Sequence, residues 1–310
     1  MRYLVTGGAG FIGSNTVDEL VRRGHSITVL DDLSGGKEQN LAGVRDKIDF
    51  IRGTITDRAT LEKACRAAEY VLHLAARTSV PRSVKQPLET NEVNVDGTLN
   101  VLVAARDAGV RRVVFASSSS IYGDTPTLPK HEEMTPAPIS PYGVSKLVGE
   151  LYGFVFHRIY GLDFVALRYF NVFGPRQDPS SPYSGVLSKF ITAMRDGGEP
   201  SVFGDGEQSR DFTFVQNVVA ANLQACETPG IGGRAFNLGT GGRYTLNYTL
   251  QLLEQFAARP AKAKYGPPRE GDIRDSQADV RRATQAFGYK PQINFEEGLR
   301  KTWDWYSAAS

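Results

Sequence analysis

The sequence is poor in residues that bind metals or form disulfides. Its 310 residues include two cysteines, Cys65 and Cys226, and four histidines. Neither residue type stands in a spacing typical of a metal or redox site. We therefore expect no metal, no disulfide framework, and free or buried thiols in a reducing compartment.

Long hydrophobic runs are absent as well. No apolar run approaches the roughly 18 residues that a transmembrane helix needs. The chain begins Met1–Thr6 and enters a glycine turn at once, without the apolar stretch and cleavage site of a signal peptide. These absences predict a cytoplasmic protein that does not enter a membrane.

An excess of charge of either sign is also missing. The 36 Lys and Arg residues nearly balance the 34 Asp and Glu residues, for a net charge of +2. Without a clustered basic excess, we expect no nucleic-acid partner. The composition, 41% hydrophobic and 23% charged, is typical of a globular protein, and the length suggests about two domains.

Short apolar segments alternate with amphipathic ones in the first half of the chain. Several apolar segments, such as Val113–Ala116, are continuously hydrophobic, as strands covered on both faces are. The alternation predicts an α/β fold with a doubly wound parallel sheet of the Rossmann type. The predicted strands are Tyr3–Thr6, Ser26–Leu30, Asp49–Arg52, Tyr70–His73, Arg112–Ala116 and Asp163–Leu167, and the predicted helices are Gly10–Arg23, Asp57–Ala67, Thr90–Ala108 and Pro141–Tyr160.

The second half predicts a smaller C-terminal substrate-binding domain. A segment rich in Pro, Gly and Ser, residues 174–185, marks the boundary, so we divide the chain into residues 1–174 and 175–310. Residues 212–240 are expected to return to the first domain's sheet through strands at Phe212–Val215 and Ala235–Leu238. Helices are predicted at Val186–Arg195, Leu246–Ala257 and Phe295–Tyr306.

A glycine turn follows the first predicted strand and opens a helix. Gly7, Gly10 and Gly13 are spaced so that backbone N–H groups can approach a pyrophosphate at a helix N-terminus. The second strand is followed by Asp31, whose carboxylate can accept hydrogen bonds from ribose hydroxyls and would repel a 2′-phosphate. Together these features predict a dinucleotide site that favours NAD over NADP.

A second motif combines a tyrosine, a lysine and a serine-rich strand end. Tyr142 and Lys146 are four residues apart and share one face of a predicted helix. A lysine ammonium beside a phenol is expected to lower the phenol's pKa and make it a usable base. The serines at Ser117–Ser120 lie at the carboxyl end of a central strand, where ligands bind in such sheets.

With these motifs in place, the chain resembles the extended short-chain dehydrogenase/reductase family, and within it the NAD-dependent nucleotide-sugar 4-epimerases. The resemblance covers nearly the whole chain. It is carried, in order, by TGGAGFIGS at Thr6–Ser14, HLAA at His73–Ala76, NVDGTLNVL at Asn94–Leu102, SSSSIYGD at Ser117–Asp124, SPYGVSK at Ser140–Lys146, LRYFNVFGPRQDP at Leu167–Pro179, GDGEQSRDF at Gly204–Phe212, FNLGTG at Phe236–Gly241 and REGDIRDSQAD at Arg269–Asp279.

The resemblance implies that residues 1–174 bind NAD. In one departure from the family, Gly53 is followed by Thr54 where an aspartate often binds the adenine amino group, which leaves that contact open. The residues that match the family's NAD site are Gly7, Gly10, Phe11, Ile12, Gly13, Asp31, Asp32, Ile55, Leu74, Ala75, Ala76, Asn94, Tyr142, Lys146 and Tyr169.

The resemblance also implies the catalytic residues. Tyr142 would be the base, Lys146 its electrostatic partner, and Ser118 the hydroxyl that orients the substrate oxygen O4. The implied reaction oxidises C4 to a 4-keto sugar, turns the sugar and reduces it from the opposite face, so that NAD is not consumed. Dehydratase relatives carry Asp-Glu where this chain has Ser119 and Ser120, so 4,6-dehydration is not expected.

The implied substrate is a UDP-sugar. Two arginines of the matching set suit a diphosphate on chemical grounds as well, because guanidinium groups match phosphate oxygens. The matching residues are Ser79, Ser118, Ser119, Ser120, Asn171, Val186, Leu187, Phe203, Arg210, Arg269, Asp272 and Ser276.

Pocket size is expected to select the sugar. Ser276 falls where epimerases restricted to plain hexoses carry a bulky tyrosine, so the resemblance favours UDP-GlcNAc/UDP-GalNAc, with UDP-Glc/UDP-Gal as a shared or main activity. Pocket differences of one small group are worth only about 1–3 kcal/mol, so overlap between substrates is expected.

Two other functions and an oligomeric state also bear on these residues. A UDP-glucuronate 4-epimerase or decarboxylase stays open, with Arg77 or Arg82 reading the carboxylate. A non-catalytic NAD-binding sensor is disfavoured because the chain keeps Tyr142 and Lys146. The resemblance implies a homodimer through the helices at Thr90–Ala108 and Pro141–Tyr160.

Overall fold

A seven-stranded parallel sheet forms the centre of the protein. The computed structural model describes residues 1–179, 185–268 and 273–308. Strand order across the sheet is β11-β6-β5-β4-β1-β2-β3, and all neighbouring strands run parallel. The strands are β1 (Arg2–Thr6), β2 (Ser26–Asp31), β3 (Asp49–Arg52), β4 (Tyr70–His73), β5 (Arg112–Ser118), β6 (Asp163–Tyr169) and β11 (Arg234–Leu238).

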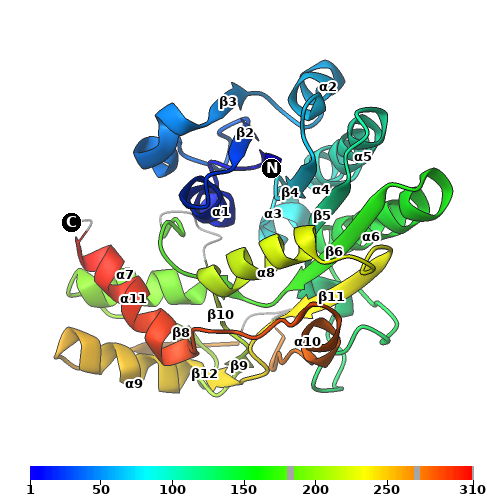
Figure 1. Cartoon of the computed structure of the whole chain (residues 1–310). Helices are drawn as coiled ribbons and strands as arrows, with labels where there is room; N and C mark the ends of the chain where they lie inside the picture. The colour runs from blue at the N-terminus through cyan, green and yellow to red at the C-terminus, as the bar shows by residue number, and fades with distance from the viewer. Residues whose placement is uncertain (180–184, 269–272, 309–310) are drawn as a thin grey trace.

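Helices cover both faces of this sheet, which confirms the predicted doubly wound fold. Alternate strand residues enter different hydrophobic clusters: Tyr3 and Val5 pack with one cluster, and Leu4 packs with the other. This alternation is what a strand buried on both faces requires. In Figure 1, α1 (Phe11–Arg22) and α8 (Val215–Glu227) lie on one side of the sheet, and α2 (Arg58–Cys65), α5 (Gly97–Asp107) and α6 (Pro141–Tyr160) lie on the other.

The helices predicted at Gly10–Arg23, Asp57–Ala67 and Pro141–Tyr160 are present close to those bounds, whereas helices at Val80–Lys85, Val215–Glu227 and Arg281–Phe287 were not predicted. Thr90–Ala108 was predicted as one helix, and the structure divides this region into α4, a π-helical turn (η2) and α5. The helices of this part are α1 (Phe11–Arg22), α2 (Arg58–Cys65), α3 (Val80–Lys85), α4 (Pro87–Asn91), α5 (Gly97–Asp107), α6 (Pro141–Tyr160), α8 (Val215–Glu227) and α10 (Arg281–Phe287), with short turns at η1 (Glu38–Lys47), η2 (Glu92–Asp96) and η3 (Ser119–Tyr122).

A third hydrophobic cluster lies in the C-terminal half, mainly on helices that Figure 1 draws beside the layers of the main sheet. Its members come mainly from α7 (Val186–Arg195), α9 (Leu246–Ala257) and α11 (Phe295–Ala308). Three two-stranded sheets complete this part: β7 (Val172–Phe173) with β10 (Thr213–Phe214), β9 (Ser209–Arg210) with β12 (Tyr244–Thr245), and β8 (Ser201–Phe203) with β13 (Lys264–Gly266).

The prediction that Phe212–Val215 returns to the main sheet is wrong. Its strand β10 pairs with β7, and Phe212 and Phe214 pack in the third cluster. The burial of Phe212 and Phe214 in that cluster holds the segment away from the main sheet, whose edge on this side is β11. The strand predicted at Ala235–Leu238 does join the sheet, as β11.

No helix within residues 1–179, 185–268 and 273–308 is long and apolar enough to cross a membrane.

Candidate active site

A large cavity opens where the direction of strand progression reverses. β1 is flanked by β2 on one side and β4 on the other, and parallel sheets bind ligands at the carboxyl ends of strands at such a point. The cavity has a volume of about 480 Å³. It is lined by the residues that follow β1, β2, β4 and β5, and by the start of α6.

The glycine turn is packed too closely for any other residue. Gly7 has a φ of +71°, and a Cβ there would lie 2.8 Å from the Cα of Ala75, which follows β4. A Cβ on Gly13 would lie 2.1 Å from the carbonyl oxygen of Gly7. Gly7 therefore permits the turn and its approach to the β4 segment, and Gly13 permits α1 to pack on the turn.

The N-terminus of α1 faces the cavity with its backbone donors uncapped. Gly10 is the N-cap, and no side chain of the described residues caps this end. Gly10, Phe11, Ile12 and Gly13 all line the cavity. Unpaired N–H groups together with the helix dipole make this end suited to a pyrophosphate.

Asp31 lies at the other wall and is buried. Its Oδ2 accepts a hydrogen bond from the Ala9 N–H at 2.9 Å, and its Oδ1 accepts one from the Leu33 N–H at 2.8 Å. Burial raises the pKa of this carboxyl, and the two backbone donors oppose the rise. Because each oxygen can accept more than one hydrogen bond, the carboxylate keeps capacity for ribose hydroxyls.

Asp32 and Arg77 join the two walls of the cavity. An Arg77 Nη lies 3.6 Å from Asp32 Oδ2, and its other Nη donates to Ser34 Oγ. On its other side, Arg77 Nε pairs with Glu89 at 3.1 Å, and Glu89 also pairs with Arg82 at 2.9 Å. Glu89 therefore pairs with both of the arginines that the sequence offered for binding a substrate carboxylate.

Asn94 lies behind the cavity wall rather than in it. Its side chain is buried and holds the backbone of Arg77 from both sides: Oδ1 accepts from the Arg77 N–H at 2.7 Å, and Nδ2 donates to the Arg77 carbonyl at 3.0 Å. Nδ2 also donates to Ser145 Oγ on α6 at 3.0 Å. Any action of Asn94 on a ligand would pass through the Arg77 segment.

Tyr142, Lys146 and Ser118 meet in this cavity. Ser140 caps α6 by accepting a hydrogen bond from the Gly143 N–H at 3.1 Å, so the helix begins one residue before Tyr142. The ammonium of Lys146 lies 5.8 Å from the centre of the Tyr142 ring and donates to the carbonyl of Ala116 at 2.8 Å. Ser118 lies beside Tyr142, and its hydroxyl donates a hydrogen bond to Ser120 Oγ at 3.1 Å.

The protonation of this pair differs from the expectation. Burial raises the pKa of Tyr142, and the Ser118 side chain beside it opposes this rise only in part. Burial lowers the pKa of Lys146 to about 7. The expectation that Lys146 by itself brings the tyrosine's pKa down is therefore wrong, because desolvation disfavours both charged forms.

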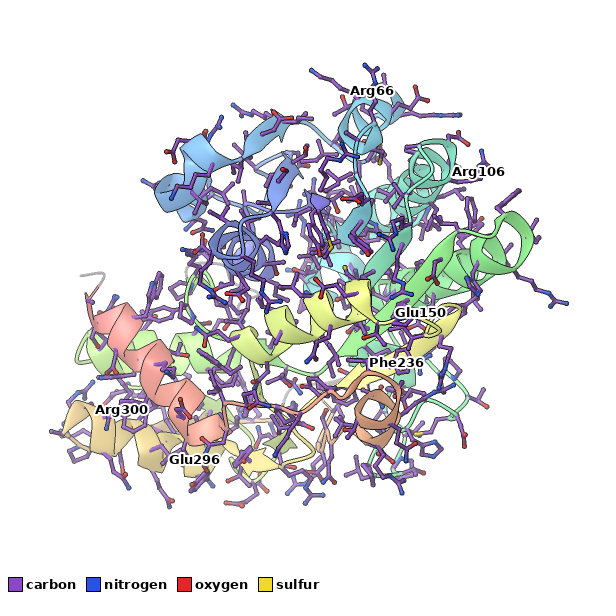
Figure 2. The ribbon with its side chains drawn as sticks, in the orientation of Figure 1. Arg66, Arg106, Glu150, Phe236, Glu296 and Arg300 are labelled. Atoms are coloured by element: carbon purple, nitrogen blue, oxygen red, sulfur yellow. The ribbon has the colours of Figure 1, made fainter. Side chains whose placement is uncertain are left out.

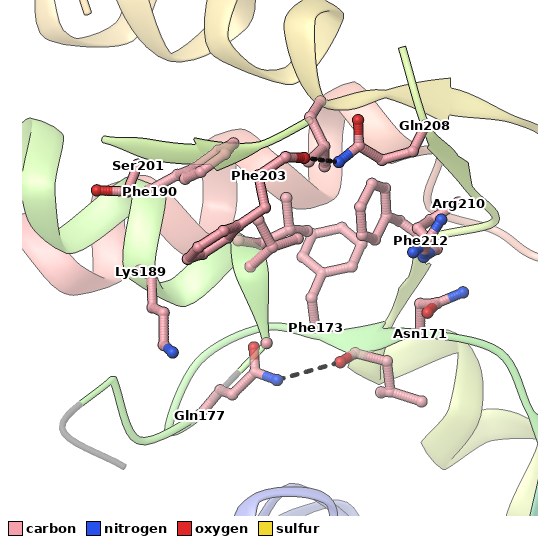
Figure 3. A pocket seen from close by; sticks show the side chains of 15 residues that line it. Asn171, Phe173, Gln177, Lys189, Phe190, Ser201, Phe203, Gln208, Arg210 and Phe212 are labelled. Atoms are coloured by element: carbon pink, nitrogen blue, oxygen red, sulfur yellow. Dashed lines mark hydrogen bonds between the residues drawn. The ribbon is translucent and has the colours of Figure 1, made fainter. Parts of the chain in front are cut away.

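A second cavity of about 270 Å³ adjoins the first and shares Asn171, Val172 and Gln177 with it. Phenylalanine rings line much of it, among them Phe203 and Phe212 (Figure 3). Asn171 and Arg210 lie at one end and Lys189 at the other. An apolar cavity with cationic side chains suits a base joined to phosphates.

Asn171 stands at the junction of the two cavities in a strained conformation. Its φ is +35°, which is uncommon for a residue other than glycine. Its Nδ2 donates to the carbonyl of Asp211 at 3.1 Å and lies 3.5 Å from Ser276 Oγ. Ser276 is thus beside the junction, although it does not line either cavity.

Most of the predicted site residues line one of the two cavities. Those in the first are Gly7, Gly10, Phe11, Ile12, Gly13, Asp31, Asp32, Ile55, Leu74, Ala75, Ala76, Ser118, Ser119, Ser120, Tyr142, Lys146, Tyr169 and Asn171. Those in the second are Asn171, Val186, Leu187, Phe203 and Arg210. Ser79 instead caps α3 by accepting from the Arg82 N–H at 3.1 Å, and Arg269 and Asp272 lie outside the described residues.

The sequence analysis missed several lining residues. Gly36 has no room for a Cβ, which would lie 2.8 Å from the carbonyl carbon of Ala9, and Gln177 lines both cavities. The Gly35-Gly36 pair after β2 was a usable signal for a close approach of backbone. Lys189 and Gln208 gave no signal, because only the fold brings their segments together.

Among the described residues, no group of three or more His, Cys, Asp or Glu side chains is placed to hold a metal ion.

Comparisons with known proteins agree with this geometry. The sequence model of the NAD-dependent epimerase/dehydratase family matches residues 3–239. The UDP-glucose 4-epimerase of Mycolicibacterium smegmatis is 41% identical over 310 residues, with 99% of this chain and 98% of that protein covered.

Two solved structures have the same fold over the whole chain. One is a UDP-N-acetylglucosamine 4-epimerase from Methanobrevibacter ruminantium in complex with UDP-N-acetylmuramic acid, with 41% identity, a TM-score of 0.95, and 100% of this chain and 99% of that chain covered. The other is the Thermus thermophilus UDP-glucose 4-epimerase in complex with NAD, with 38% identity, a TM-score of 0.91 and full coverage of both chains, 100% and 100%.

Proposed function

The chain belongs to the NAD-dependent epimerase/dehydratase family, and we propose that it interconverts the C4 epimers of UDP-hexoses through a transient 4-keto sugar. The single observation that carries the proposal is the meeting of Tyr142, Lys146 and Ser118 in the cavity that the glycine turn also lines. A proton-transfer group and a dinucleotide turn in one cavity suit oxidation and reduction of a hydroxyl carbon.

The residues around the first cavity fit NAD. The uncapped N-terminus of α1 would bind the pyrophosphate, and Asp31 the adenosine ribose. The close contacts at Gly7 and Gly13 show that this wall is built for backbone approach. Bound NAD supplies reversible acceptance of a hydride, together with a positive charge on its nicotinamide ring.

Tyr142 would act as the base that takes the proton from the sugar O4 hydroxyl and later returns it. Ser118, which lies beside Tyr142, would hold the same oxygen. Protonated Lys146 lies close enough to Tyr142 to stabilise the phenolate, and the lysine's pKa of about 7 leaves it partly charged at neutral pH. The positive charge of the nicotinamide would add to this effect and offset the burial that raises the tyrosine's pKa.

The second cavity would anchor the nucleotide diphosphate. Arg210 is oriented by donating to the carbonyls of Ser209 and Arg274, both at 2.9 Å. Phe203 offers a ring beside the same space, and Asn171 offers an amide at the junction. A firm hold on the nucleotide lets the 4-keto sugar turn in the first cavity without leaving the protein.

We infer that the preferred sugar is N-acetylated. Ser276 lies 3.5 Å from the Asn171 amide nitrogen, and its small side chain leaves room beside the junction. A tyrosine at this position would extend into the space that an N-acetyl group needs during rotation. UDP-GlcNAc/UDP-GalNAc is therefore the favoured pair, and UDP-Glc/UDP-Gal is the second candidate.

The arrangement of the arginines does not favour UDP-glucuronate. Reading a C6 carboxylate needs a cation with donors to spare, and Glu89 pairs with both Arg77 and Arg82. Asp32 adds a second carboxylate beside Arg77. A new carboxylate would have to compete with these two.

We also propose a homodimer, formed mainly through α6. Val144, Leu151, Val155 and Ile159 recur along one face of α6 and are between 46% and 66% exposed. Leu88 of the adjacent α4 is 85% exposed. Such a continuous apolar face is typical of a protein interface. Within α5, by contrast, Leu102 is buried in the core and Leu99 packs against it.

The proposal is tested with Tyr142→Phe, which removes the phenolic oxygen and keeps the ring. We expect loss of C4 epimerisation with bound NAD retained, measured by NMR of the sugar products and by cofactor release on denaturation. Retained turnover would show that another group is the base. NAD binding without turnover of any UDP-sugar by the unaltered protein would favour the non-catalytic sensor.

A further inference from the structure

Two ion pairs lie at opposite ends of the β5–β6 strand pair: one joins the two strands, and the other joins β6 to α6. At the amino end, Arg112 of β5 lies opposite Asp163 of β6, and their side chains pair at 2.5 Å. At the carboxyl end, Ser117 of β5 lies opposite Arg168 of β6. Arg168 forms a bidentate pair with Glu150 of α6, at 2.9 and 2.7 Å, and Ser117 Oγ donates to the same carboxylate.

The second pair is buried almost completely. The side chains of Arg168 and Glu150 are 6% and 1% exposed. Glu150 lies on the long helix α6, labelled in Figure 2. Removing two charges from water is costly, and replacing a buried ion pair by apolar residues is often neutral or stabilising. Stability alone is therefore a poor reason for charges at this place.

The carboxylate of Glu150 joins the two elements that carry the proton-transfer groups. Tyr142, Lys146 and Glu150 follow at intervals of four residues and share one face of α6. Ser117 is the residue before Ser118 at the end of β5. The hydrogen bond from Ser117 to Glu150 therefore fixes the helix of Tyr142 against the strand end of Ser118.

The network continues toward the substrate side of the cavity. Arg168 Nη1 donates to the Tyr122 hydroxyl at 2.8 Å, and this hydroxyl donates to Asn237 Oδ1 at 2.7 Å. Asn237 Nδ2 donates to the carbonyls of Lys130 at 2.9 Å and Asp279 at 3.3 Å. The segment that contains Ser276 is thus tied to the same buried carboxylate.

We propose that Glu150 and Arg168 are positioning residues, which set the spacing between the hydroxyls of Ser118 and Tyr142. The inference rests on the proposed function of these two groups. Proton transfer needs heavy atoms within hydrogen-bond distance, and a displacement of about 1 Å can cost about 100-fold in rate. Neither residue lines the described cavities, so both act through Ser117 and the α6 backbone.

The test replaces each ion pair by apolar residues of similar volume. One variant is Glu150→Leu with Arg168→Met, and the matched control is Asp163→Leu with Arg112→Met, in the same two strands at the end away from the cavity. We expect the first to lower kcat about 10- to 100-fold, with KM and NAD content within about twofold of the unaltered protein. We expect the control to lower thermal stability and to leave kcat within about twofold.

Two results would overturn the inference. One is an unchanged kcat in the Glu150/Arg168 variant, and the other is an equal loss of kcat in the control. If the first variant does not fold, Ser117→Ala removes only the hydroxyl between β5 and Glu150, and we expect a several-fold lower kcat at unchanged KM. An unchanged kcat there would equally contradict the inference. The proposed function is judged separately, by turnover of the unaltered protein.

Discussion

Lys146→Met should change how the protein's stability depends on pH. Lys146 is 3% exposed, and burial lowers its pKa from 10.5 to about 7. Between these two values the unfolded chain holds a proton that the folded chain has released. Stability therefore rises with pH in this range. Below pH 7 the folded protein bears the full free-energy cost of keeping the buried Lys146 side chain charged.

The magnitude follows from the two pKa values. With a pKa of about 7 in the folded chain and 10.5 in the unfolded chain, proton linkage raises the free energy of unfolding by at most about 2 kcal/mol from pH 7 to pH 9. The methionine variant lacks this titration, while every other group is the same in both proteins. Urea denaturation of NAD-depleted protein at pH 7, 8 and 9 measures the difference between the two curves.

Parallel curves for the two proteins would refute this reasoning. They would mean that Lys146 keeps an ordinary pKa in the folded protein, either because water reaches it or because the Ala116 carbonyl holds the ammonium form. A raised pKa would also give parallel curves in this range, because the wild-type protein would then lose stability relative to the variant only above the ordinary pKa of 10.5.

Three further perturbations follow from the geometry. Gly13→Ala should abolish NAD binding, because its Cβ would lie 2.1 Å from the Gly7 carbonyl oxygen. The control Gly24→Ala has open space around its Cβ and is strained only by a φ of +75°, so it should lower the free energy of unfolding by about 1 kcal/mol and retain NAD. Cofactor content and thermal melting distinguish the two variants. Ser276→Tyr should remove activity on UDP-GlcNAc and keep it on UDP-Glc, and equal loss of both in a coupled product assay would exclude a gate at this position. Leu151→Glu should place a charge in the proposed α6 interface and yield monomers by light scattering, and a persistent dimer would locate the interface elsewhere.

Local sequence patterns predicted the features that local physics controls. The run of strands and helices was readable because β1 to β6 are short apolar segments between amphipathic ones. The spacing of Gly7, Gly10 and Gly13 was readable because a turn that approaches another backbone admits no Cβ. Tyr142 and Lys146 were readable because residues four apart share a helix face.

Features that depend on contacts between distant segments could not be predicted from the sequence. The pairing of Glu150 with Arg168, and the hold of Glu89 on Arg77, join separate elements and leave no mark in local periodicity. The pKa values of Tyr142 and Lys146 depend on burial by several elements at once, so the four-residue spacing did not show that burial raises the pKa of the tyrosine and lowers that of the lysine. The strand β10 was misplaced because a short apolar segment does not specify its partner.

The central claim is that this protein inverts C4 of a UDP-hexose without consuming NAD. The most direct measurement incubates the purified protein with UDP-GlcNAc and, separately, with UDP-Glc, and resolves the C4 epimers by NMR with Tyr142→Phe as control. We expect UDP-GalNAc from the first substrate, no net formation of NADH, and no product with the variant. Two results would contradict the proposed 4-epimerase activity: conversion of neither substrate while NAD stays bound, or equal conversion by Tyr142→Phe.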